Sequence, residues 1–225
     1  MFVAVEEKLD HDPNAVCRLL LVRHGPTPAT RQRRFPADEP LDEDGLRRAR
    51  GLSEVFAEAS LVLSSPALRA LQTARAAGFE AVPDPDLAEC NFGSWVGSTF
   101  AQVWESDPAG LEAWLADPSA RPHGGESLAE MLARMGRFLE RASECPETTV
   151  AVAHGGPIRA AVVLALGAPA ETLWRLEVDP LSVTELLHGA GGWRLARFNW
   201  RDGWRPVPLN PPDEQQPGQE NGAVA

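Results

Sequence analysis

The stretch that decides the fold is RLLLVRHGPTPAT, residues 18–30. Its apolar run, Leu19 to Val22, is typical of a buried strand and ends at two polar side chains, Arg23 and His24. A glycine and a proline then interrupt regular structure. Ligands bind at the carboxyl ends of the strands in open α/β sheets, so Arg23 and His24 are candidates for a binding site. Two polar residues at a strand exit can also be simply solvated, so the rest of the chain must decide.

A second junction of the same kind occurs in TTVAVAHGGPIRAAVVLALG, residues 148–167. An apolar strand again ends at a histidine, His154, and a helix then begins at Gly155. If the two strands are parallel neighbours, His24 and His154 lie at the same edge of the sheet. The free backbone N–H groups and positive dipole end of the helix after His154 would suit an anion.

The remaining pattern alternates strands with helices and predicts an α/β fold. We expect a three-layer sandwich, with a mostly parallel sheet, helices on both faces and a C-terminal hairpin. The serines before Pro66 predict a capped helix over 67–77 with Pro66 at its first position. The expected segments are strands at 61–63 and 79–87, helices at 46–56, 67–77 and 126–144, an irregular, partly helical excursion at 92–122 and the hairpin at 181–200.

Composition limits the partners and the domain organisation. The net charge of −11 over 225 residues argues against nucleic acid or an acidic membrane surface as a partner. No apolar run approaches the ~20 residues of a membrane span, and three widely spaced cysteines fit a reducing cytoplasm. We expect one domain over 17–200, between a flexible segment at 1–16 without signal-peptide features and a disordered tail at 206–225.

Arginines complete a candidate anion pocket. Arg69 lies about one turn into the helix expected at 67–77, and Arg23 precedes His24. Arginine binds the oxygens of a phosphate bidentately and keeps its charge at working pH. Together with His154 and the helix start at Gly155, these side chains would form a pocket for a phosphoryl group.

Five motifs in order resemble the histidine phosphatase superfamily, in its phosphoglycerate-mutase-like branch. They are LVRHG, SSPALRALQTA, LAECNFGSWVG, PHGGESLAEMLARM and VAVAHGGPIRA, and the resemblance runs from about Arg18 to Asn199. The resemblance implies that His24 is the nucleophile and forms a phosphohistidine that water then attacks. It implies that Arg23, Arg69 and His154 clamp the phosphoryl oxygens, and that Glu89 gives a proton to the leaving alcohol.

The chain departs from its relatives around the leaving group. Thr30 replaces an asparagine that many relatives carry, and its hydroxyl could still contact phosphate. Arg34 is followed by Phe35-Pro36-Ala37 where many relatives continue differently. Arg34 is a candidate for contact with substrate or phosphate, with a solvated position in a loop as the alternative. His123 is expected to be structural or exposed, with the rim of the pocket as the alternative. These departures put the substrate in doubt rather than the chemistry.

The leading functional prediction is a metal-independent phosphomonoester hydrolase without a cofactor. Its partner would be a small phosphorylated substrate, with α-ribazole phosphate as one named candidate. A cofactor-dependent phosphoglycerate mutase is the alternative, but ECNFGSWVG lacks the arginine and tyrosine that mutases of this family usually carry there. A non-catalytic module that binds a phosphorylated ligand is the third class. The natural ester and the oligomeric state stay open.

Overall fold

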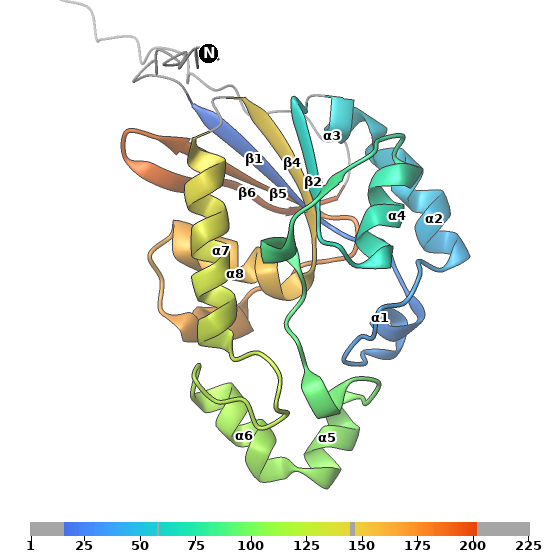
Figure 1. The fold of residues 1–225 in the computed structure, drawn as a ribbon, viewed down its shortest axis with the longest axis vertical. Helices are drawn as coiled ribbons and strands as arrows, with labels where there is room; N and C mark the ends of the chain where they lie inside the picture. Colours follow the sequence, from blue (N-terminus) through green and yellow to red (C-terminus); the bar gives the residue numbers. More distant parts are fainter. Residues whose placement is uncertain (1–15, 58, 145–146, 202–225) are drawn as a thin grey trace, which may run out of the picture.

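The computed structural model describes residues 16–57, 59–144 and 147–201. One sheet of six strands runs through it in the order β3-β2-β4-β1-β5-β6 (Figure 1). The strands are β1 Cys17–Arg23, β2 Leu61–Ser64, β3 Val82–Pro83, β4 Thr148–Ala153, β5 Val183–Gly189 and β6 Gly192–Trp200. The first four pair in parallel, whereas β5 and β6 form an antiparallel hairpin beside β1. The predicted mostly parallel sheet with a C-terminal hairpin is confirmed.

Helices cover both faces of the sheet. They are α1 Pro28–Gln32, α2 Glu43–Ala49, α3 Ser53–Ala57, α4 Leu68–Ala76, α5 Phe100–Ser106, α6 Pro108–Ala116, α7 Leu128–Ser143 and α8 Gly155–Ala165. Helices α2 to α4 lie on one face and α7 and α8 on the other, which confirms the three layers (Figure 1). Helices α5 and α6 project away from the sheet, within the excursion expected at 92–122. The expected flexible segment at 1–16 (apart from residue 16) and the tail at 206–225 lie outside the described residues.

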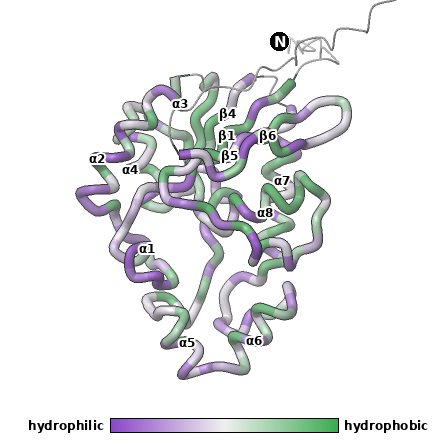
Figure 2. Tube along the Cα trace, turned by 180° about the vertical axis from the view of Figure 1, so that it is seen from behind, coloured by the Kyte–Doolittle hydropathy of each residue, from purple (hydrophilic) through white to green (hydrophobic). Residues whose placement is uncertain are grey.

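The unbroken apolar run of β1 follows from its place between two layers. Leu19 and Leu21 belong to the core beneath α7 and α8, whereas Leu20 and Val22 belong to the core beneath α2 to α4. All four side chains are buried, because successive residues of a strand point to opposite faces. Figure 2 shows that the strands at the centre are hydrophobic, whereas α1 and α2 at the surface are more hydrophilic.

The pairing of β1 with β4 sets the position of the two histidines. Arg23 is in register with Ala153, and the His24 backbone N–H donates to the Ala153 carbonyl at 3.0 Å. His24 and His154 therefore leave the sheet side by side at the carboxyl ends of parallel strands. Their ring centroids are 4.9 Å apart.

Two local predictions on the α2–α4 side are wrong. The single helix expected over 46–56 is split into α2, a 3₁₀ turn at Arg50–Leu52 and α3. Helix α4 begins at Leu68 and not at Pro66, and its N-cap, Ala67, has no side-chain cap. The Ser65 hydroxyl does accept the Ala67 N–H at 3.3 Å, but it also bonds His154, so this serine is drawn toward the neighbouring strand rather than the helix.

No helix in the described residues is long and apolar enough to cross a membrane.

Candidate active site

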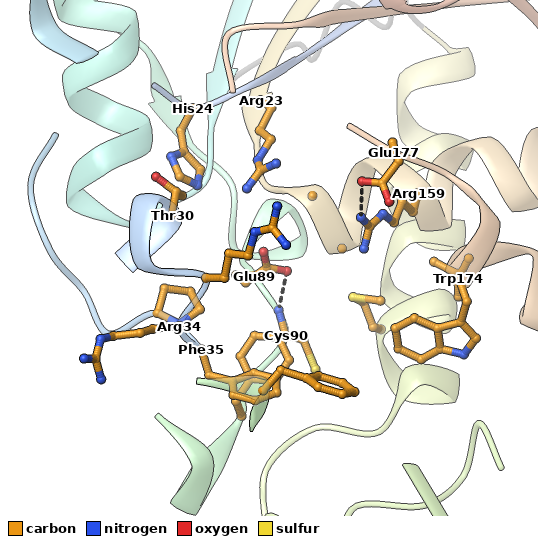
Figure 3. A pocket seen from close by; sticks show the side chains of 18 of the residues that line it. Arg23, His24, Thr30, Arg34, Phe35, Glu89, Cys90, Arg159, Trp174 and Glu177 are labelled. Atoms are coloured by element: carbon orange, nitrogen blue, oxygen red, sulfur yellow. Dashed lines mark hydrogen bonds and ion pairs between the residues drawn. The ribbon is translucent and has the colours of Figure 1, made fainter. Parts of the chain in front are cut away.

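A cavity of about 800 Å³ opens at the carboxyl ends of β1 and β4. Arg23 and His24 form its inner end, and Glu89 lies between them and the aromatic wall (Figure 3). The aromatic lining residues are Phe35, Phe92, Phe100, Trp114 and Trp174. The volume lies within the range of small-molecule sites.

The tautomer of His24 follows from its hydrogen bonds. Nδ1 lies 2.7 Å from the Gly25 carbonyl oxygen, which can only accept, so the proton is on Nδ1. Nε2 then carries a free electron pair, and the Arg69 Nε–H donates to it at 3.3 Å. His24 thus presents an unprotonated nitrogen beside a guanidinium group, as a nucleophilic histidine requires.

The surroundings keep both histidines neutral. Burial lowers the pKa of His24 well below its usual value, and the charges of Arg69 and Arg23 lower it further. Burial likewise lowers the pKa of His154 well below the usual value, with His24 and the same arginines adding to the effect. A positive charge on either ring would lose its hydration and face two guanidinium groups.

His154 is oriented by Ser65. Its Nε2 lies 2.7 Å from the Ser65 hydroxyl, and its Nδ1 is buried without a hydrogen-bond partner among the described residues. Ser65 is fully buried at the end of β2. If the hydroxyl donates to Nε2, the proton of His154 sits on Nδ1 and is free to donate to a ligand oxygen.

Backbone oxygens hold the buried Arg69 and the half-buried Arg23. The Arg23 Nη1 donates to the Val178 carbonyl, and the Arg69 Nη1 donates to the Ala37 carbonyl at 2.8 Å. Burial lowers the pKa of both groups, and the negative charge of Glu89 opposes that shift. Arg23 lines the cavity, whereas Arg69 lies behind it, with its Nε 3.3 Å from the His24 Nε2. Two guanidinium groups beside one histidine are suited to an anion with several oxygens.

Thr73 joins the loop that follows His24 to α4. Its hydroxyl accepts the Gly25 N–H at 3.0 Å and donates to the Arg69 carbonyl at 2.8 Å. Because the Gly25 carbonyl orients the His24 ring, Thr73 links the position of His24 to that of Arg69. The sequence alone does not predict that Thr73 makes this link, because its hydroxyl accepts from Gly25, which is 48 positions away.

Glu89 reaches the cavity from the loop after the 3₁₀ turn Pro85–Leu87. Its side chain is half-buried, and its Oε1 accepts the Cys90 N–H at 3.0 Å (Figure 3). The same oxygen lies against Gly156 in the first turn of α8. Glu89 thus shares the cavity with His24 and Arg23, as a proton donor to a leaving group would have to.

Three further predicted residues, Gly155, Thr30 and Arg34, line the cavity with different contacts. Gly155 is the first residue of α8, whose N-cap, His154, makes no side-chain cap hydrogen bond. The Thr30 hydroxyl already donates to the Thr27 carbonyl at 2.8 Å, so a phosphate contact would have to displace this bond. The Arg34 guanidinium binds the Gly97 carbonyl at 2.7 Å and is turned away from His24 in Figure 3.

Several residues that line the cavity were not predicted from the sequence. Arg159 lies one turn into α8 and is 3.8 Å from Glu177, a carboxylate that is 91% exposed. Trp174 packs edge-to-face on Trp114 with ring centroids 4.7 Å apart. Its spacing of five residues from His154 is a signal that could have placed Arg159 near the site. Only the fold shows that its side chain lines the cavity. His123 does not line the cavity and is buried against the rings of Phe92, Trp95 and Trp114.

The described residues contain no group of three or more His, Cys, Asp or Glu side chains that could hold a metal ion. The cationic residues that line the cavity are the arginines Arg23, Arg33, Arg34 and Arg159. The neutral His24 lies beside the buried Arg69 and the half-buried Arg23, and His154 lies at the start of α8. Such an arrangement in an α/β fold is suited to phosphoryl transfer.

The comparison with known families agrees with this class. The profile of the histidine phosphatase superfamily (branch 1) matches residues 19–201, and the chain belongs to this superfamily. Among curated proteins, the chain is 39% identical over 192 residues to a bifunctional protein of Mycobacterium tuberculosis, covering 79% of this chain and 53% of that protein. The chain thus spans about half the length of the first curated relatives that it matches.

Other relatives are named as phosphatases. A glucosyl-3-phosphoglycerate phosphatase of Mycobacterium tuberculosis is 32% identical over 208 residues, covering 83% of this chain and 93% of that protein. A solved mycobacterial structure of the same name, in complex with VO3, has a TM-score of 0.71 at 32% identity and covers 82% of this chain and 99% of that one. The solved structure of the α-ribazole phosphatase of Shigella flexneri has a TM-score of 0.73 at 28% identity. The match covers 84% of this chain and 100% of that one.

Proposed function

We propose that the protein is a phosphomonoester hydrolase that works through a phosphohistidine on His24. The observation that carries this proposal is the His24 ring, which holds its proton on Nδ1 against the Gly25 carbonyl and leaves Nε2 unprotonated beside Arg69. Superfamily membership and relatives named as phosphatases support it.

In the first step, His24 Nε2 attacks phosphorus and the bond from phosphorus to the ester oxygen breaks. Arg23 and Arg69 stabilise the charge on the phosphoryl oxygens, and Arg69 exchanges its bond to Nε2 for one to phosphate. His154 donates from Nδ1, and the N–H groups at Gly155 add to the same clamp. Glu89 protonates the departing alcohol.

In the second step, water attacks the phosphohistidine and the bond between nitrogen and phosphorus breaks. Glu89, now a carboxylate, accepts a proton from the water, so the products are inorganic phosphate and the original His24. The guanidinium groups supply the positive charge for both steps. We therefore expect turnover to persist in the presence of a chelator.

The walls of the cavity support a small phosphorylated metabolite as substrate. Aromatic rings surround the leaving-group side, and Arg159 with Glu177 adds a polar edge. The printed names of relatives make α-ribazole phosphate and glucosyl-3-phosphoglycerate candidates. The cytoplasmic location and the absence of nucleic-acid partners stay predictions from composition.

The test is phosphate release from a panel of esters, with chelator and without added metal. The panel contains the two candidates above, phosphoserine and 3-phosphoglycerate. We expect wild-type turnover on at least one ester and an acid-labile, base-stable phosphoenzyme, both lost in His24→Ala. His188→Ala is the matched control, because His188 pairs with Cys17 at the opposite end of β1 and packs on Trp193.

Three outcomes would contradict the proposal. Turnover that survives in His24→Ala would exclude the phosphohistidine. Interconversion of phosphoglycerates that depends on their bisphosphate would favour the mutase. Tight binding of phosphorylated ligands by folded protein, without turnover of any ester, would favour the binding module.

A further inference from the structure

The first turn of α8 touches the carboxyl group of Glu89 at a glycine. A Cβ added to Gly156 would lie 2.4 Å from the Glu89 Oε1 and 3.1 Å from the Met131 Sδ. Real Cβ atoms essentially never approach an oxygen to under 3.0 Å. Glu89 therefore occupies space that any other amino acid at position 156 would fill.

The backbone of Gly156 does not itself require glycine. The residue is helical within α8 and is absent from the glycines with positive φ. Glycine is less favourable than alanine in a helix, because it loses more conformational freedom on folding. The benefit of glycine at this position is thus the missing side chain and not the backbone conformation.

Helix α8 is the less mobile of the two partners. Pro157, Ile158 and Ala160, which follow the glycine, are buried in the core. Glu89 is a flexible side chain on a loop, held at Oε1 by the Cys90 N–H. A methyl group at position 156 would therefore displace the carboxyl group, while the Met131 thioether can rotate away.

We propose that Gly156 is a positioning residue for Glu89: its missing side chain allows the Glu89 carboxyl group to reach the leaving-group oxygen. This inference rests on the proposed function and adds the element that sets the place of the proton donor. Moving Oε1 from 2.4 Å to an ordinary contact of 3.4 Å requires a shift of about 1 Å. A misplacement of that size can cost about 100-fold in rate.

The effect has a signature that general damage to the site would not have. An alkyl alcohol needs a proton as it leaves, whereas p-nitrophenolate leaves as a stable anion. Misplacing the proton donor should therefore slow alkyl esters far more than p-nitrophenyl phosphate. The ratio kcat/KM isolates this step, because it reports only the steps up to formation of the phosphoenzyme and release of the alcohol.

The experiment compares kcat/KM of wild type and Gly156→Ala on the best alkyl ester of the panel and on p-nitrophenyl phosphate. We expect a loss of about 100-fold on the alkyl ester and a loss under about 3-fold on p-nitrophenyl phosphate. In a Glu89→Gln background, Gly156→Ala should cause no further loss on the alkyl ester, because its effect passes through Glu89. Thermal unfolding checks that the variant is folded.

Two other glycines calibrate the result. Gly136→Ala places the same methyl group in α7, where nothing lies within 4 Å of it, and should leave both esters unaffected. Gly155→Ala places a Cβ 3.8 Å from the Arg23 Cζ, at the phosphoryl end of the cavity. Any effect of Gly155→Ala should therefore be equal on the two esters, since both carry the same phosphoryl group.

Equal losses on both esters in Gly156→Ala would overturn the positioning role, and so would an unchanged alkyl ester. An additive loss in the Glu89→Gln background would also overturn it. Failure of the proposed function is distinguishable, because it would appear as turnover of either ester by His24→Ala, whatever the behaviour of Gly156→Ala.

Discussion

At the scale of single residues, the reactivity of the site depends on backbone carbonyls and a few hydroxyls. The Gly25 carbonyl fixes the tautomer of His24, and the Ser65 hydroxyl fixes the orientation of His154. Thr73 holds the Gly25 N–H against α4. Each of these groups is buried, so each loses a partner that water cannot replace if it is changed.

We therefore expect Thr73→Val to impair both stability and catalysis. The substitution keeps the shape of the side chain but leaves the buried Gly25 N–H without its acceptor, at a cost of about 1–3 kcal/mol. The freed loop would also hold His24 less firmly and lower kcat. Urea unfolding and steady-state kinetics measure the two effects. Thr73→Ser retains the hydroxyl and is the control; equal behaviour of the two variants would refute the role of this hydrogen bond.

At the scale of elements, the segment that carries Glu89 is fixed by two close backbone approaches. The Ser94 N–H donates to the His123 carbonyl at 2.9 Å, and the Glu126 N–H donates to the Asn91 carbonyl at 2.8 Å. Arg134 of α7 also donates to the Asp86 carbonyl and to both carboxylate oxygens of Glu126. The loop with Glu89 is thus tied to α7 through backbone groups on both sides.

The close approach of these two segments predicts that a methyl group at Gly125 strongly affects stability. A Cβ there would lie 1.9 Å from the Asn91 carbonyl oxygen, a backbone atom that cannot rotate away. We expect Gly125→Ala to destabilise the protein by about 1–3 kcal/mol. It should also lower activity, because the loop with Glu89 must shift.

The paired measurement is Gly136→Ala in the middle of α7. Its added methyl group meets nothing within 4 Å, so better helix propensity should stabilise the protein by about 0.5–1 kcal/mol. Chemical denaturation of the two variants provides the comparison. Equal free energies of unfolding for Gly125→Ala and Gly136→Ala would mean that the loop with Glu89 moves without loss of stability.

At the scale of the whole molecule, folding collects a cationic pocket within a chain of net charge −11. The residues come from β1, β2, α4, the loop after β3 and α8, so the pocket exists only when the three layers are packed. Burial of His24 and His154 between these layers is what lowers their pKa values. The site therefore couples the stability of the fold to pH.

The sign of this coupling follows from proton binding. In the unfolded chain both histidines bind protons as the pH falls through about 6.5, whereas in the folded protein their lowered pKa values keep them neutral. The unfolded state then holds more protons, so stability falls as the pH drops below about 6.5. The slope is at most about 1.4 kcal/mol per pH unit for each histidine.

We expect a shallower loss of stability between pH 7 and pH 5 in the double variant His24→Gln/His154→Gln than in the wild type. Urea unfolding at a series of pH values measures both curves, and the carboxylates contribute equally to each. Parallel curves would show that these two histidines do not titrate on unfolding.

The sequence predicted the strands and the residue types of the site, but not the contacts that orient them. The run Leu19–Val22 and the two histidine junctions are local patterns, and strand period with turn residues suffices to place them. The start of α4 was wrong because Ser65 bonds His154, a residue 89 positions away. Arg34 was a candidate for contact with substrate or phosphate, and the fold turns its guanidinium group toward the Gly97 carbonyl.

By itself, the sequence determined that a sheet would bring two histidines to one edge, with Arg23 beside the first of them and Arg69 on a nearby helix. These features depend on apolar periodicity and on residue chemistry, which any local segment displays. Only the tertiary structure decided which nitrogen of His24 is free, which arginine donates to that nitrogen and how closely Glu89 approaches α8. Those choices depend on distances between segments far apart in the chain, which the packing of helices on both faces of the sheet sets and local sequence does not encode.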